Sequence, residues 1–130
     1  MLVAALLPAC SAIKLAYNQA PDLSYWWLDS YLDFNGQQTP KVRDELGKLF
    51  AWHRANQLPN VTALLQKTQA QLSGTVSPEQ ACAAVDEVRG LYDAIVEKGL
   101  PAVSELVTSI DPEQLAHLQR KYQKNNEEYM

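Results

Sequence analysis

Few side chains in this sequence are of the types that carry out acid–base chemistry. His53 follows Trp52 in an apolar stretch, and Asp29 and Asp33 lie upstream of it. A histidine oriented by an aspartate is the beginning of a general acid–base pair. No nucleophile in a tight turn and no glycine-rich loop is present to form an oxyanion hole. We therefore interpret His53 as a structural histidine between helices, and an enzyme that uses it with Asp29 or Asp33 is a remote alternative.

Metals, cofactors and nucleic acids are not expected partners. The second histidine, His117, is far from His53 in the sequence and is expected on a helix surface. No cysteine or carboxylate stands near either histidine at the spacing of a zinc site. The net charge of -4 gives no advantage on a phosphate backbone. No small-molecule substrate is evident, so we expect a protein that is not an enzyme.

Cys10 is the residue with the clearest chemical role. The first nine residues are almost wholly apolar and too short to span a bilayer. The segment Leu7-Pro8-Ala9-Cys10 resembles a lipobox, and its setting is typical of the end of a signal peptide. The resemblance implies cleavage before Cys10, a diacylglycerol on its sulfur and an acyl chain such as palmitate on its new amino group. The alternative is an apolar N-terminus with an ordinary thiol.

This lipid anchor predicts the location of the protein and its layout. Two or three acyl chains hold a protein firmly at a membrane. Ser11 follows the cysteine, and the resemblance implies that serine there directs a lipoprotein to the outer membrane, facing the periplasm. We expect residues 1–9 to be a signal-peptide remnant, residues 10–16 a tether and residues 17–130 a helical domain.

Cys82, the other cysteine, is expected to be buried and inert. It lies within an apolar helical pattern, where a thiol behaves as a small hydrophobic group. If Cys10 is lipidated, Cys82 has no partner in the chain. A disulfide between two copies is the alternative.

Three helix starts share one pattern: a capping residue followed three positions later by glutamine. They begin at Asn35, Ser77 and Asp111. In each, the cap can accept a hydrogen bond from the first turn, and the glutamine can bond back to the cap. We expect an all-α fold, an irregular helical bundle of four or five helices with long amphipathic arms. A short helix over residues 22–33 is expected to precede the arms.

The apolar residues recur at helical spacing along these arms. We expect Pro59 and the Gly99-Leu100-Pro101 segment to kink the arms or divide them. The series that mark the expected packed faces are Val42, Leu46, Leu49, Phe50 and His53; Val61, Leu64, Leu65, Thr68 and Leu72; and Val85, Val88, Leu91, Tyr92, Ile95, Val96, Leu100, Val103, Leu106 and Val107.

Aromatic residues gather in the part of the chain nearest to Cys10. The candidates for an interface are Tyr25, Trp26, Trp27 and Tyr31. Neighbouring tryptophans on a helix point about 100° apart, so both need not face one core. One interpretation packs these rings against the next helix beside Trp52. Another makes them a membrane-facing platform, because tryptophan and tyrosine favour the headgroup boundary. A site for a partner protein is the third.

Several of these elements together resemble a known family. The residues that carry the resemblance are Tyr17-Asn18-Gln19-Ala20, Tyr25-Trp26-Trp27-Leu28-Asp29-Ser30-Tyr31, Trp52-His53-Arg54 and Leu58-Pro59, with the lipobox and the later Pro-Glu-Gln helix starts. They are similar to a family of Gram-negative lipoproteins catalogued as a domain of unknown function. Its members are usually longer, and the final helix lacks a glycine or proline stop, so we expect the parent protein to continue.

The expected function is therefore a membrane-anchored envelope lipoprotein with a protein-binding or envelope-support role. Its partners would be the membrane and another envelope protein. The helix starts at Asn35, Ser77 and Asp111 also resemble the Leu-Thr-x-x-Gln elements of small periplasmic chaperones. A chaperone-like helical protein is the alternative.

Overall fold

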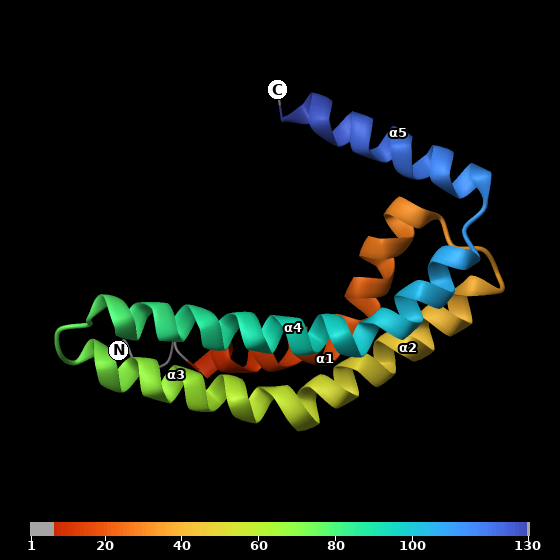
Figure 1. The fold of residues 1–130 in the computed structure, drawn as a ribbon. Helices are drawn as coiled ribbons and strands as arrows, with labels where there is room; N and C mark the ends of the chain where they lie inside the picture. Colours follow the sequence, from red (N-terminus) through yellow and green to blue (C-terminus); the bar gives the residue numbers. More distant parts are fainter. Residues whose placement is uncertain (1–6, 130) are drawn as a thin grey trace. The chain divides into compact units, whose positions relative to one another are not determined.

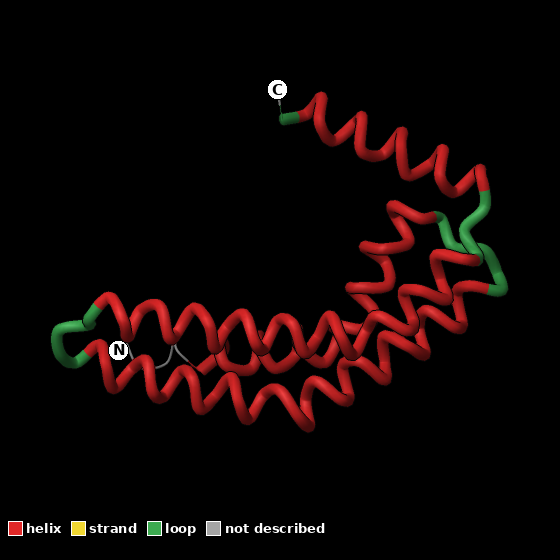
Figure 2. Tube along the Cα trace, viewed as in Figure 1, coloured by secondary structure: helices red, strands yellow, loops and turns green. Residues whose placement is uncertain are grey.

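The computed structural model describes residues 7–129, with side chains from residue 12 onward, and every regular element in this range is helical (Figure 2). The all-α prediction is therefore confirmed. The elements are α1 (Leu7–Leu32), α2 (Gln38–Trp52), the π-helical segment η2 (His53–Gln57), α3 (Leu58–Leu72), α4 (Pro78–Thr108) and α5 (Pro112–Glu128) (Figure 1).

All three predicted capping boxes form. The side chain of Asn35 accepts from the Gln38 N–H at 3.0 Å. At the start of α4, Ser77 Oγ accepts from the Gln80 N–H at 3.2 Å. The Asp111 carboxylate does the same for the Gln114 N–H at 2.9 Å. Each glutamine returns a bond to the N–H of its cap. These starts depend only on local sequence, which is why the pattern identified them.

The helix at the N-terminal end is longer than expected. It begins at Leu7 rather than near Asp22, and Pro21 lies inside it. Residues 10–16, expected as a tether, are therefore helical. Residues 1–6 of the expected signal-peptide remnant lie outside the described part of the chain.

The two proline predictions have different outcomes. Before Pro59 the arm changes to the π-helical segment η2, in which the Leu58 N–H bonds to the carbonyl of His53. Proline lacks an N–H and its ring crowds the carbonyl one turn back, so a wider turn relieves the clash. Pro101, by contrast, lies inside the continuous helix α4, which is not divided there.

The contacts of the chain group into two compact units. Unit 1 comprises the chain up to Gly47 together with the chain from Leu106 onward. Unit 2 comprises Lys48–Glu105. No helix in residues 7–129 is both long enough and apolar enough to cross a bilayer.

Unit 1 has a small apolar core. Tyr25, Phe34 and Val42 are its buried members, and the rings of Tyr25 and Phe34 lie 5.8 Å apart. Side chains packed around them are Leu28, Leu32, Leu46 and Leu106.

A buried pair of amides joins the two helix corners of unit 1. Gln38 Nε2 donates to Gln114 Oε1 at 3.1 Å, and Gln114 Nε2 donates to Gln38 Oε1 at 2.7 Å. These are the same glutamines that complete the capping boxes of α2 and α5. Each amide therefore serves its own helix start and the opposite corner at once. We call this pair the polar junction.

The junction is built alike on both sides. Gln38 Nε2 also donates to the carbonyl of Ser109 at 2.9 Å, just after α4. Gln114 Nε2 donates to the carbonyl of Asp33 at 3.1 Å, just after α1. Asp33 and Ser109 each lie two positions before the cap of their corner. The repeated sequence pattern is thus a repeated structural unit, paired with itself.

Unit 2 contains α3 and most of α4, joined by a turn into a hairpin (Figure 1). An ion pair between Lys67 and Glu87 links the two helices. Neither α3 nor α4 has a fully buried residue. Gln57, in η2, is buried, and its Oε1 has no hydrogen-bond partner within the described part of the chain. This unit has a thin core.

Candidate interaction surfaces

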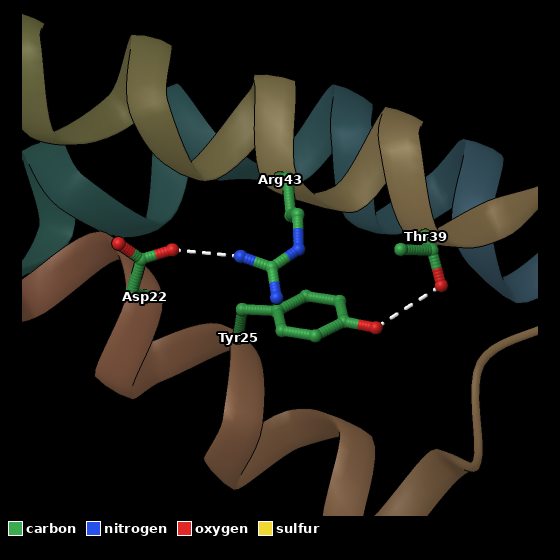
Figure 3. Close-up of polar contacts among 4 residues, drawn as sticks. All are labelled: Asp22, Tyr25, Thr39 and Arg43. Carbon is green, nitrogen blue, oxygen red and sulfur yellow. Dashed lines mark hydrogen bonds and ion pairs between the residues drawn. The ribbon is translucent and has the colours of Figure 1, made fainter.

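Tyr25, one of the four aromatic candidates, does not face outward. Its side chain is only 6% exposed, and its hydroxyl shares a hydrogen bond of 3.0 Å with the Thr39 hydroxyl (Figure 3). The Arg43 guanidinium lies 3.8 Å from the ring centre and pairs with Asp22 at 2.7 Å. The expectation that Tyr25 is an interface residue is wrong, because its ring fills the core of unit 1 and its hydroxyl ties α1 to α2.

Tyr31 is half-buried and joins α1 to α5. Its ring lies between those of Trp27 and Tyr122, with centroids 5.1 and 5.7 Å away. Asn125 Nδ2 donates to its hydroxyl at 2.9 Å. Tyr31 therefore supports Trp27 from the side and is mainly a packing residue.

Trp26 and Trp27 are exposed, at 57% and 62%. Neither ring is buried, and Trp27 stacks on Tyr31 of its own helix. Other exposed or small residues continue their side of the helix. We call this surface the α1 face; at about 100° per residue it comprises Ala12, Leu15, Ala16, Gln19, Leu23, Trp26, Trp27 and Ser30.

The α1 face carries no charge within residues 12–32. The charged residues of that stretch are Lys14, Asp22 and Asp29. Each lies about 90° or more from the direction midway between the two tryptophans. Asp22 pairs with Arg43, and the Asp29 carboxylate accepts from the Phe34 N–H at 2.9 Å. Both carboxylates thus point toward the packed side of unit 1.

A second exposed apolar surface runs along α4 within unit 2. We call it the α4 face; it comprises Val85, Val88, Tyr92, Val96, Leu100 and Val103, all exposed. These residues belong to the longest apolar series of the sequence, which was expected to pack. Of that series, Leu91, Ile95 and Leu106 are half-buried. The apolar arc of α4 is wider than its packed side, so much of it remains uncovered.

The structure describes the side chain of Cys82 but not that of Cys10. The side chain of Cys10 lies outside the described residues, so lipidation there stays a prediction. Cys82 is exposed, and the expectation of a buried thiol is wrong. It lies in the first turns of α4, where the thin hairpin offers little cover.

Of the candidate acid–base residues, Asp29 and Asp33 make hydrogen bonds at the end of α1, and His53 lies in η2. Asp33 takes a left-handed conformation, with φ of 48°, just after α1 ends. The Asp33 N–H donates to the carbonyl of Asp29 at 2.8 Å. The Phe34 N–H donates to the carboxylate of the same Asp29. Both acids thus close the end of a helix. His53 is half-buried in η2, in unit 2.

His117 lies half-buried on α5 and contacts α1. Its Nε2 lies 3.1 Å from the carbonyl oxygen of Ser30, so this nitrogen is the donor. It borders an open hollow beside the polar junction that Asp111, Glu113 and Arg120 also line. The hollow is mostly polar and lacks the apolar enclosure typical of small-molecule sites. Among the described residues, no group of three or more His, Cys, Asp or Glu could hold a metal ion.

A family model matches most of the chain. The family is described as a family of unknown function, DUF6279, and the match covers residues 30–130. The chain belongs to this family. The resemblance to a family of unknown function is therefore confirmed. No curated protein and no solved structure matches the chain.

The part matched to DUF6279 contains the polar junction and the α4 face. Sequence reasoning found both glutamines of the junction as capping residues but missed that they bond to each other. The signal available was the recurrence of one corner pattern 76 positions apart. For α4, the width of the apolar arc was the signal, since one neighbouring helix cannot cover it.

Proposed function

We propose that this DUF6279 protein is a non-enzymatic envelope lipoprotein that is anchored through Cys10 and binds another protein through the α4 face. The lipobox-like Leu7-Pro8-Ala9-Cys10 supports the anchor. Ser11 supports an outer-membrane location facing the periplasm. The observation that carries the binding role is the α4 face.

The α4 face has the dimensions of a helix-binding surface. From Val85 to Val103 it extends about 27 Å along the helix. Its largest side chain, Tyr92, is 64% exposed. Contiguous apolar patches of this kind mark interaction sites, because burying them releases free energy of about 25 cal/mol per Å². An amphipathic helix laid along such a surface is a common mode of recognition.

The charge beside the face points to a basic partner. Asp86, Asp93 and Glu97 each directly follow a residue of the face, about 100° further around the helix. Arg89 lies within the arc of the face and pairs with Asp86 at 3.3 Å, while Asp93 and Glu97 continue the edge as acidic residues. Lysine or arginine beside the apolar side chains of a partner helix would complement this edge.

Photo-crosslinking in a Gram-negative host tests this function. A benzophenone amino acid at Tyr92 lies on the α4 face, and one at Ala83, about 180° around the helix, is the matched control. We expect one discrete cross-linked protein from Tyr92 and none from Ala83, with the cross-link lost in Val96→Asp. The cross-linked peptide should carry basic residues beside apolar ones. Equal products at both positions, or none at either, would contradict the proposal.

A chaperone-like role is the second candidate, since an exposed apolar face also suits unfolded clients. It would yield a ladder of many cross-linked proteins from Tyr92. The purified protein would then suppress the aggregation of an unfolded test protein, and Val96→Asp would lower that activity.

A further inference from the structure

We propose that the α1 face lies on the membrane surface, with Trp26 and Trp27 at the headgroup boundary of a zwitterionic lipid layer. This inference rests on the proposed anchoring at Cys10 for its cellular setting. It assigns to unit 1 a second contact with lipid, separate from the anchor and from the α4 face.

The chemistry of the α1 face suits a lipid surface. It combines the two exposed tryptophans with exposed Leu15 and Leu23. Tryptophan favours the headgroup boundary because its ring is apolar while its N–H can be hydrated. Amphipathic helices that lie in this plane bury one apolar side to about 5–10 Å.

The position of the charges supports the same orientation. Lys14, Asp22 and Asp29 lie away from the face, and both carboxylates are engaged with unit 1. A helix lying on lipid through this face would bury uncharged residues and leave Lys14, Asp22 and Asp29 at its border or on its far side. A protein partner recognised through charge pairs would find none here, so a lipid surface is the better match.

The layout of α1 also places this face near the anchor. The helix includes Cys10 and runs without a break to Leu32. Trp26 lies about 24 Å along the helix from Cys10. The anchor at the start of α1 and the tryptophan pair near its end would be two lipid contacts in one chain, and such contacts reinforce each other.

The absence of cations on the face gives a sharp expectation about lipid charge. Basic peripheral proteins bind anionic vesicles and are released by salt. This protein has a net charge of -4 and no cation on the α1 face. Binding should therefore be at least as strong to phosphatidylcholine as to mixtures with phosphatidylglycerol, and insensitive to salt.

Vesicle flotation of the full chain carrying Cys10→Ala tests the inference without the lipid anchor. We expect it to float with phosphatidylcholine vesicles, with tryptophan emission shifted to shorter wavelength. The double variant Trp26→Ser/Trp27→Ser should bind at least tenfold more weakly. The matched control, Tyr92→Ser/Val96→Ser, removes two exposed apolar residues from the α4 face and should bind unchanged. Trp26→Ser alone should also weaken binding. Among the described side chains Trp26 makes no ring contact, whereas Trp27 packs on Tyr31, so this single change does not disturb that packing.

Each opposite result would overturn the inference. These results are a Cys10→Ala protein that does not float, an equal loss of vesicle binding in the two double variants, or binding that requires anionic lipid. Because the assay omits the anchor, a failure here leaves anchoring at Cys10 intact. An unmodified Cys10 in cells would in turn leave the vesicle result standing.

Discussion

At the scale of single residues, the polar junction does the most to define unit 1. Gln38 and Gln114 are both buried, although glutamine is usually exposed. Burial of an amide is tolerated only when its donors and acceptor are satisfied. Here the two amides bond to each other and to backbone groups at both corners. Removing one partner takes from the other buried amide the two hydrogen bonds that the pair shares.

The glutamines of the junction should therefore be far more sensitive than the third capping glutamine. We expect Gln114→Leu to lower the free energy of unfolding by about 3 kcal/mol. Gln80→Leu, in the exposed box of α4, should cost about 1 kcal/mol or less. Urea denaturation followed by circular dichroism measures both. In a double-mutant cycle, Gln38→Leu with Gln114→Leu should cost less than the sum of the single changes. An equal loss of unfolding free energy in Gln80→Leu and Gln114→Leu would show that only helix capping by these glutamines contributes to stability.

Tyr25 should behave as a core residue with one useful hydroxyl. Tyr25→Phe keeps the ring under Arg43 and removes the bond to Thr39. We expect a loss of about 1 kcal/mol in unfolding free energy, the usual value for one hydrogen bond. Tyr92→Phe, on the exposed α4 face, is the control and should change stability little. A similar effect at both positions would contradict the buried placement of Tyr25.

At the scale of elements, helix starts followed from the sequence and the exposure of helix faces did not. Asn35, Ser77 and Asp111 act on their own first turn, so a few neighbouring residues decide the outcome. Which side of α1 or α4 packs depends instead on distant helices. For this reason Tyr25, Trp26 and Trp27 looked equivalent in sequence, whereas one is buried and two are exposed.

The prolines of the arms show the same division between local and distant effects. Pro59 and Pro101 both remove a helical hydrogen bond, and only the first coincides with a change of helix type. Local rules identify the strain, while the packing on either side decides whether a helix breaks. Helix α4 continues through Pro101, so the whole α4 face lies on one continuous helix.

That continuity predicts a gain in stability when Pro101 is replaced. Pro101 is exposed and lies inside α4. Proline in a helix interior costs up to about 3 kcal/mol relative to alanine. We expect Pro101→Ala to raise the free energy of unfolding by about 1–3 kcal/mol, measured by thermal and urea denaturation. Pro112→Ala is the matched control, because Pro112 begins α5, where proline suits the helix. A loss of stability at Pro101 would mean that α4 depends on the proline.

At the scale of the whole molecule, each unit offers a different exposed apolar surface. Unit 1 has the uncharged α1 face, and unit 2 has the α4 face with its acidic edge. Their chemistry suits different contacts, a lipid layer for the first and a basic helix for the second. The proposed anchor at Cys10 is what would bring both to the envelope.

The mass of the N-terminal peptide is the most direct test of this account. The protein would be produced in a Gram-negative host from its natural gene, and the peptide analysed by mass spectrometry. The account predicts a peptide that begins at Cys10 and carries a diacylglyceryl group and an amide-linked acyl chain. A peptide that retains Met1 with Cys10 unmodified would contradict membrane anchoring and the function proposed from it.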